Sequence, residues 1–110
     1  MAVSDEQVEF VLDLFSDLGP ITTRKMMGGM MFYHDGVIFA ALMRDGRVQL
    51  KGAGDFADAL DAAEWERWTY QRAGSDKVTA MPYWVMPEAL LDDPEEACAW
   101  ARRALSALND

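Results

Sequence analysis

Residues 24–51 read RKMMGGMMFYHDGVIFAALMRDGRVQLK, and the fold can be worked out from this stretch outward. Two Asp-Gly pairs, Asp35-Gly36 and Asp45-Gly46, separate three apolar runs that are each short enough to be a strand. Asp-Gly favours the positive backbone angles of tight hairpin turns, so the runs are expected to fold back as an antiparallel meander. The expected strands are residues 30–33, 37–43 and 47–51.

The second and third runs differ in how they alternate. Residues 37–43 contain no polar side chain, which predicts a central strand with both faces covered. In the third run, Val48 and Leu50 point to one face, and the residues between them point to the other. We expect that second face to be solvated, because its members are all polar: Arg47, Gln49 and Lys51.

Helices are expected before and after the meander in the chain. Ser4 and Gln7 have the spacing of a capping box, in which each side chain bonds the backbone amide of the other residue. A helix over residues 5–18 follows. Gly19-Pro20 ends it, because glycine permits a left-handed stop and proline cannot continue a helix. Asp93-Pro94 marks the start of the last helix as cap and first position.

The remaining segments complete the sheet. Residues 21–25 are expected to link the first helix to the meander, and Asp55 to cap a short helix after it. Residues 68–71 and 78–84 have strand composition and are separated by a turn. Pro82 lacks an amide hydrogen, so it confines the later strand to a sheet edge or a bulge.

Together these patterns predict an α+β protein with one domain over residues 1–110, in which the antiparallel meander plus two further strands packs against N- and C-terminal helices. The length suits one domain, and 51% hydrophobic residues supply ample core material. No apolar run reaches the length of a membrane span and nothing resembles a secretory signal, so we expect a cytoplasmic protein without membrane contact.

Charge is distributed unevenly along the chain. The net charge is −9, which repels phosphate backbones, so we do not expect the protein to wrap nucleic acid. Residues 24–51 carry five basic against two acidic side chains, a local charge of +3. This basic strip suits an acidic partner surface or a small anion. The more general alternative is a solvated sheet face.

Patterns for catalysis and metal binding are weak. A His/Cys zinc site lacks ligands in a chain with one His and one Cys, and no cofactor is expected. We expect His34, in the first hairpin turn, to be exposed and not catalytic, because no nucleophile accompanies it. Cys98 is expected to be an inert, partly buried thiol. Gly28-Gly29 lacks the spacing of a phosphate-binding loop and indicates a bulge or a close backbone approach.

The segment 81–87, MPYWVMP, is aromatic and bounded by proline. Two interpretations stay open. Tyr83 and Trp84 either form a recognition surface for a partner segment or close one end of the core, and the second is favoured because such rings carry so much apolar area.

The landmarks taken in order resemble the N-terminal domain family of TfoX, the regulator of competence genes in bacteria. They are LGPIT at 18–22, RKMMGG at 24–29, YHDGVIFA at 33–40, LK at 50–51, MPYW at 81–84 and PE at 87–88. The chain departs from the family where Met27 and Trp68 stand in place of Phe and Met31 in place of Gly. These changes exchange one apolar filler for another or remove a flexible residue.

The resemblance implies a regulatory domain and carries over no catalytic or ligand-binding residue. Longer regulators of this kind add a C-terminal helical domain, which suits nucleic-acid contact better and is expected to be absent here. The leading hypothesis is therefore a non-enzymatic domain that binds a protein partner, or itself as a homodimer, through the polar sheet face and the aromatic segment. The binding residues expected from this sheet face and aromatic segment are Arg24, Lys25, Arg47, Lys51, Tyr83 and Trp84. Nucleic-acid binding through the basic sheet face is the alternative, and an enzyme is the third hypothesis.

Overall fold

The computed structural model describes residues 3–26, 28–71 and 73–108, and within these ranges six strands form one antiparallel sheet in the order β1-β2-β3-β4-β6-β5. The strands are β1 (Thr22–Met26), β2 (Gly29–His34), β3 (Val37–Leu42), β4 (Val48–Lys51), β5 (Glu66–Gln71) and β6 (Val78–Val85). The helices are α1 (Asp5–Leu14), the 3-10 helix η1 (Ser16–Leu18), α2 (Gly54–Ala62), α3 (Glu88–Leu91) and α4 (Pro94–Leu108). The predicted α+β class is confirmed.

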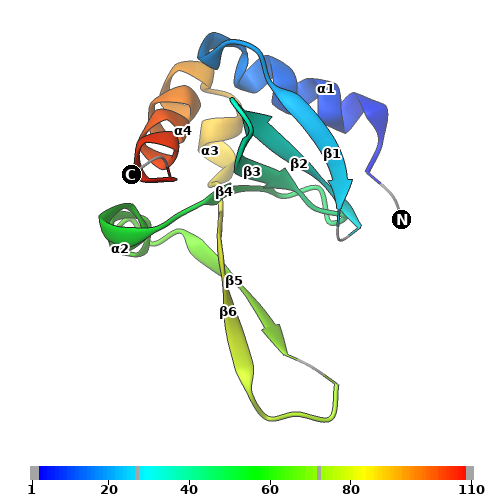
Figure 1. Cartoon of the computed structure of the whole chain (residues 1–110), viewed down its shortest axis with the longest axis vertical. Helices are drawn as coiled ribbons and strands as arrows, with labels where there is room; N and C mark the ends of the chain where they lie inside the picture. Colours follow the sequence, from blue (N-terminus) through cyan, green and yellow to red (C-terminus); the bar gives the residue numbers. More distant parts are fainter. Residues whose placement is uncertain (1–2, 27, 72, 109–110) are drawn as a thin grey trace.

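Helices cover one face of the sheet. Figure 1 shows α1 and α4 running along one side of β1 to β4, while the β5–β6 hairpin projects away from the body. The hairpin contributes to the long dimension of a molecule that measures 42 × 33 × 27 Å. Among the described residues, no helix combines the length and apolar character needed to cross a bilayer.

The first helix begins as its sequence indicates but ends earlier. The backbone amide of Gln7 donates to Ser4 Oγ at 3.2 Å, and Ser4 N donates to Gln7 Oε1 at 2.9 Å, so the capping box is confirmed. The α-helix stops at Leu14, and the last expected turn tightens into η1. Gly19 follows with a φ of +98° and a ψ of −161°, a conformation that favours glycine, so the helix stops at the predicted glycine but without a left-handed helical cap.

The interpretation of residues 21–25 as a link is wrong, because Thr22–Met26 forms the edge strand β1. It pairs with β2 from Thr22 opposite Tyr33 to Met26 opposite Gly29. The meander therefore has four strands. An edge strand with four exposed polar residues shows no alternation of apolar and polar positions, so only the β-branched threonines signal it.

Gly29 sits where the chain passes close to a neighbouring strand. A Cβ at this position would lie 2.5 Å from the backbone oxygen of Leu42, so only glycine fits without a shift. The predicted close backbone approach at Gly28-Gly29 is confirmed. Gly28 itself has a φ of +78°, which suits the turn between β1 and β2.

The later strands confirm the expected hairpin and its irregularity. β6 lies between β4 and β5, and the register of β5 against β6 shifts between Arg67 and Thr69. Pro82 lies opposite this shift, which agrees with its expected place at a bulge. Its carbonyl accepts from Gly52 N at 3.1 Å. The strand residues begin at Glu66, two positions before the predicted start.

Of the two caps predicted for the later helices, one is confirmed and one is wrong. Asp93 Oδ1 accepts from Glu96 N at 3.2 Å, so Asp93 caps α4 as predicted. Asp55 does not cap α2, because that helix begins at Gly54 with Ala53 in the cap position and no side-chain bond. Asp55 instead lies in the first turn, where its charge favours the positive end of the helix.

The main core lies between the sheet and the helices. Phe15 packs edge-on against Phe39 with 5.4 Å between ring centroids, and Trp65 meets Trp100 at 4.9 Å. Cys98 is fully buried, and its thiol donates to Leu14 O at 3.3 Å. Burial raises the pKa of the Cys98 thiol, so the expectation of an inert cysteine agrees with its surroundings.

Candidate functional site

The face of the sheet turned away from α1 and α4, called the outer face below, carries a continuous row of side chains. Strand register places one residue from each strand opposite the next, so these side chains share a face. In the order of the strands, the row is Arg24, Met31, Ala41, Gln49, Val85 and Glu66. Its two ends are charged and its centre is apolar apart from Gln49.

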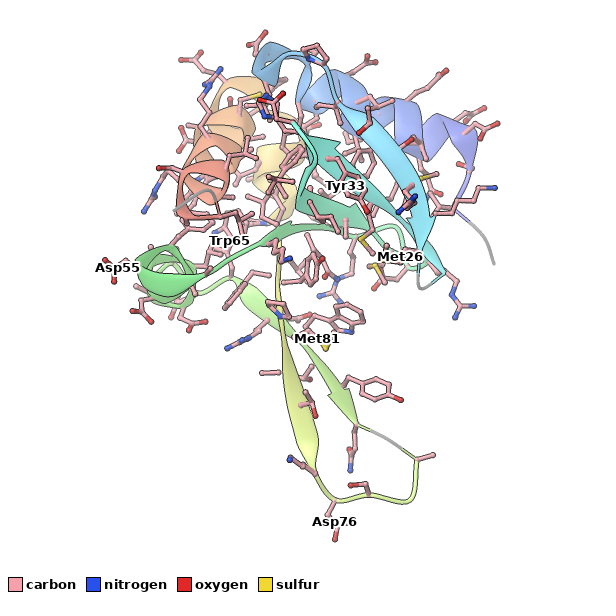
Figure 2. The ribbon with its side chains drawn as sticks, in the orientation of Figure 1. Met26, Tyr33, Asp55, Trp65, Asp76 and Met81 are labelled. Carbon is pink, nitrogen blue, oxygen red and sulfur yellow. The ribbon has the colours of Figure 1, made fainter. Side chains whose placement is uncertain are left out.

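The centre of the outer face is buried, although no helix of the described residues packs above it. Met31, Ala41 and Tyr83 form a second small cluster, separate from the main core. Trp68 of β5 packs against Tyr83 with 6.0 Å between ring centroids. Figure 2 places Met81 where the hairpin leaves the body, with Met26 and Tyr33 on the strands of the body. The partly buried members of this cluster are Met26, Tyr33, Ile38, Met43, Trp68 and Met81.

The expectation of a solvated second face on β4 is therefore wrong at its middle position. Arg47 is exposed and Lys51 half-buried, but Gln49 is only 3% exposed. The strand alternates as predicted, yet Gln49 lies between Ala41 and Val85 on the neighbouring strands. Met43 and Trp68 line the same groove beside it, and no local pattern in β4 indicates that Gln49 is buried.

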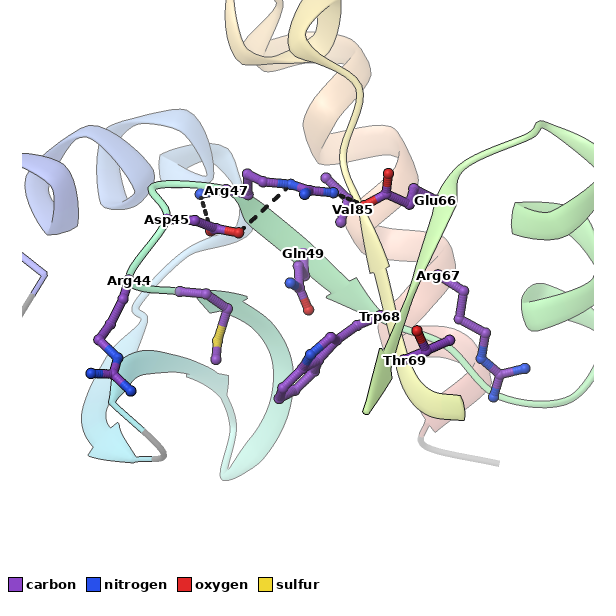
Figure 3. A pocket seen from close by; sticks show the side chains of 10 residues that line it. Arg44, Asp45, Arg47, Gln49, Glu66, Arg67, Trp68, Thr69 and Val85 are labelled. Atoms are coloured by element: carbon purple, nitrogen blue, oxygen red, sulfur yellow. Dashed lines mark hydrogen bonds and ion pairs between the residues drawn. The ribbon is translucent and has the colours of Figure 1, made fainter. Parts of the chain in front are cut away.

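A groove of about 560 Å³ opens on this face. The turn between β3 and β4 forms one wall, β5 with Trp68 forms the other, and Gln49 and Val85 belong to the lining between them (Figure 3). Its volume falls in the range of small-molecule and cofactor sites, about 300–1,000 Å³. The groove is thus large enough for a ligand or for a partner's side chains.

The Gln49 carboxamide is the chemically distinctive part of the groove. Its carbonyl oxygen Oε1 is buried and has no hydrogen-bond partner among the described residues. Buried polar atoms without a partner are rare and destabilising, at about 1–3 kcal/mol each. Figure 3 shows the side chain extending from β4 into the groove, above the ring of Trp68. The oxygen is itself shielded, so an outside donor could reach it only after the side chains around the groove rearranged.

Arg47 closes one end of the groove. Its backbone amide donates to Asp45 Oδ1 at 2.9 Å, and its guanidinium Nη2 donates to Glu66 Oε2. Nε lies 3.9 Å from Asp45 Oδ2. The side chain therefore joins the β3–β4 turn to β5 and is held in place, at the surface where such pairs contribute at most about 1 kcal/mol.

The structure brings some of the predicted binding residues together and separates others. Arg24, Arg47, Lys51 and Tyr83 share the outer face, by register or by two-residue spacing along β4. Lys25 lies opposite Met30, on the side of the sheet that the helices cover, and is exposed at the β1 edge. The basic strip of the sequence is thus not one surface.

Tyr83 and Trp84 are both buried, which agrees with the core alternative. Trp84 faces the helices, donates from Nε1 to Asp61 Oδ1 at 2.7 Å, and has the Arg67 guanidinium 4.4 Å from its ring centroid. Tyr83 lies on the outer face beneath Trp68. Burial, and secondarily the charge of Tyr33, raises the pKa of Tyr83.

His34 has a structural contact that the sequence did not indicate. It is half-buried rather than exposed, and its Nε2–H donates to Leu18 O at 2.9 Å, which ties the end of η1 to β2. Nδ1 lies 3.7 Å from Asp35. Within the described parts of the chain, no three His, Cys, Asp or Glu side chains gather as a metal site would require.

Gln49, Trp68 and Arg44 line the groove and were not among the predicted site residues. One signal for Gln49 was present in the sequence. The run 37–43 has no polar residue, which indicates that both faces of this central strand are covered. Gln49 lies opposite Ala41 of that strand, so the same cover extends over Gln49. For Trp68 and Arg44 no local pattern points to the groove.

The comparison with known families agrees with the resemblance seen in the sequence. A family model described as the TfoX N-terminal domain matches residues 13–108, which is nearly the whole chain. A search of curated proteins returned no match.

Proposed function

Because the chain belongs to the TfoX N-terminal domain family, we propose that it is a non-enzymatic regulatory domain that binds a protein partner in the control of bacterial competence, in the cytoplasm. The binding surface in this proposal is the outer face of the sheet.

One observation carries this proposal. The outer face has an apolar centre of methionine and aromatic side chains, and within the described ranges no helix packs above it, whereas α1 and α4 cover the opposite face. Methionine adapts its shape to different partners, and aromatic residues, methionine and arginine are enriched in protein interfaces. Such a surface supports recognition of another protein better than it supports catalysis.

The charges around this centre favour an acidic partner. Arg24 and Lys51 lie on the outer face and form no ion pair within the described residues, although the chain as a whole has a net charge of −9. A partner with carboxylates around an apolar contact would complement them and would be steered towards this face. A second copy of this acidic chain also carries carboxylates that could face the basic residues of the outer face.

The nucleic-acid alternative has less support from the arrangement. Arg47 is already paired with Asp45 and Glu66, and Lys25 points to the other side of the sheet. A long polyanion would therefore meet few free cations on an acidic body. A salt titration separates the two functions, because phosphate contacts make affinity fall steeply with salt.

The test is a double charge reversal, Arg24→Glu with Lys51→Glu, at two outer-face residues that form no ion pair within the described residues. We expect loss of partner capture in a pull-down and of any self-association in size-exclusion chromatography, with the melting temperature nearly unchanged. The matched control is Lys77→Glu with Arg102→Glu, which changes the net charge equally at two exposed residues away from the groove. Capture that survives the first pair, or is lost equally with the second, would remove the outer face as the interface.

A further inference from the structure

A second, smaller groove of about 220 Å³ lies where α1, α3 and the β3–β4 turn meet, and is called the α1 groove below. Its apolar lining comes from Phe10, Val11, Leu42, Val48 and Leu91. We propose that the α1 groove is a docking site for a basic segment of a partner protein, which places one apolar side chain beside Phe10. No residue of the outer-face row lines this groove, so the proposal stands apart from the interface proposed above.

Phe10 is the exposed part of the groove. Among the described residues, the exposed large apolar side chains are Phe10, Tyr70 and Val78, and only Phe10 lies outside the β5–β6 hairpin. Phe10 is 46% exposed, whereas its neighbour Val11 is fully buried and belongs to the main core. A partner side chain laid against this ring would remove apolar area of both molecules from water, which stabilises a complex.

The size of the groove favours a side chain over a free ligand. Its volume of about 220 Å³ lies below the range of about 300–1,000 Å³ that is typical of small-molecule sites. The capping box already engages two polar groups of the lining, because Ser4 Oγ accepts from Gln7 N at 3.2 Å and Gln7 Oε1 accepts from Ser4 N at 2.9 Å. We expect recognition to depend on apolar contact and on the charges around the groove.

α1 supplies one acidic border of the groove. It carries Asp5, Glu6, Glu9 and Asp13 and no basic residue. Glu6 lies four positions before Phe10 and Asp13 three positions after it, so both carboxylates share the side of the helix that Phe10 occupies. All four acids are exposed, and none forms an ion pair within the described residues. Their charge is therefore available to a partner.

α3 and the residues after it supply a second acidic border. Residues 88–93 read EALLDD, with three acids and no base around Leu91 of the lining. Such a surface attracts lysine and arginine side chains and repels phosphate groups and acidic segments. A second copy of this chain is a poor match, because it carries 19 acidic against 10 basic residues.

These features define the chemistry of the partner segment. It has an apolar residue with lysine or arginine residues around it, as a basic amphipathic helix does. Helices of this kind bind by placing apolar anchors in a groove of the partner. The acidic borders would steer the segment towards the groove, and the contact with Phe10 would hold it there.

The experiment uses a synthetic amphipathic peptide of leucine and lysine, with fluorescence anisotropy to measure affinity and NMR spectra of the full chain to locate binding. We expect binding that weakens with salt, with chemical-shift changes concentrated on α1, the β3–β4 turn and α3. A matched peptide of leucine and glutamate should not bind. A peptide of serine and lysine with the same charge should bind about tenfold or more weakly, because it lacks the apolar anchor.

Phe10→Ser should lower the affinity for the leucine–lysine peptide about tenfold or more, as expected for an aromatic contact at the centre of an interface. Tyr70→Ser is the matched control, because Tyr70 is a similarly exposed ring on the hairpin, and it should leave the affinity unchanged. Melting curves establish that each variant is folded.

Glu6→Gln with Asp13→Asn should weaken peptide binding and reduce its dependence on salt, because the acidic border loses two charges beside Phe10. The matched control is Asp58→Asn with Asp76→Asn, which removes the same charge at two exposed residues outside the groove. Equal loss of affinity in both pairs would show a general effect of net charge and would overturn the proposal.

The proposal would also be overturned if the leucine–lysine peptide fails to bind at submillimolar concentration, if Phe10→Ser binds it as tightly as the parent, or if the shifts are confined to the outer face. Self-association of the parent chain that is lost in Phe10→Ser would overturn it in favour of a second copy as the occupant. Arg24→Glu with Lys51→Glu should retain peptide binding, so the α1 groove and the proposed interface can fail separately.

Discussion

Met31 and Phe32 are neighbours on β2, both fully buried, yet they lie on opposite faces of one sheet with different surroundings. Phe32 belongs to the main core, beneath α1 and α4. Met31 belongs to the small outer cluster, which Trp68 and Met81 of the hairpin strands flank and which none of the helices that the structure describes covers. Burial alone therefore does not distinguish a face that stabilises the fold from a face that is available for recognition.

The two faces differ in how freely their side chains can repack. The helix-covered face is filled by large side chains from several elements that constrain one another. The outer face is filled by flexible thioethers and by rings on the edge hairpin, and it contains the unsatisfied Gln49. We infer that the first face supplies most of the stability and that the second can exchange its contacts for those of a ligand or partner.

The largest effect is expected from Phe32→Ala. Removal of the ring leaves a cavity that the rigid helix-covered face cannot fill, so the free energy of unfolding should fall by about 4 kcal/mol. Denaturant unfolding measures it. A loss below about 2 kcal/mol would show that this face is as adaptable as the other.

Met31→Ala should have a smaller effect, although Met31 is equally buried. The neighbouring Met26 and Met43 are partly buried and flexible, so they can close part of the cavity. We expect a loss of about 2–3 kcal/mol in the free energy of unfolding, at the low end for such substitutions. A loss equal to that of Phe32→Ala in the same denaturant series would contradict the comparison.

Gln49→Leu should stabilise the protein by about 1 kcal/mol, because it replaces an unpaired buried carboxamide with an apolar group of similar size. Chemical denaturation measures the change, with Gln71→Leu as a control of opposite sign: it removes an exposed hydrogen bond to Ser75 O and should lower stability by at most about 1 kcal/mol. If Gln49→Leu is instead destabilising, the carbonyl is paired in solution and the outer face is better satisfied than its geometry indicates.

The smallest effect at neutral pH is expected from Tyr83→Phe, which becomes visible in alkali. Burial raises the pKa of Tyr83 above its ordinary value of 10.0, so the unfolded chain releases this proton at a lower pH than the folded one. The folded state then holds more protons, and the free energy of unfolding should fall as pH rises above about 10. Tyr83→Phe should flatten this fall. Identical slopes above pH 10 for parent and variant would place Tyr83 in contact with water.

Local patterns in the sequence predicted several elements correctly. Asp35-Gly36 and Asp45-Gly46 mark turns between strands, Ser4 and Gln7 form a capping box, and Asp93 caps the last helix. Each signal acts within a few residues and needs no knowledge of the fold. The failures have the opposite character. Thr22–Met26 becomes a strand because β2 lies beside it, since its own residues carry no apolar alternation.

The candidate site could be predicted only in outline. The basic residues on alternate positions of β4 were correctly placed on one face, but the groove needs the turn before β4 and the strand β5 to come together. That approach depends on the insertion of β6 between β4 and β5, a pairing of residues more than thirty positions apart. The hydrogen bond from His34 to Leu18 O likewise joins residues that are distant in the chain, so no local pattern predicts it.

The amino-acid sequence by itself determined where the chain turns, where the helices begin, and which run lies at the centre of the sheet, because these depend on backbone preferences and short-range periodicity. Only the tertiary structure decided that Gln49 is buried, that Thr22–Met26 pairs as an edge strand, and that β6 is covered on both faces at Tyr83 and Trp84. The physical reason is that burial is a property of the surfaces that meet, and those surfaces come from segments far apart in the chain.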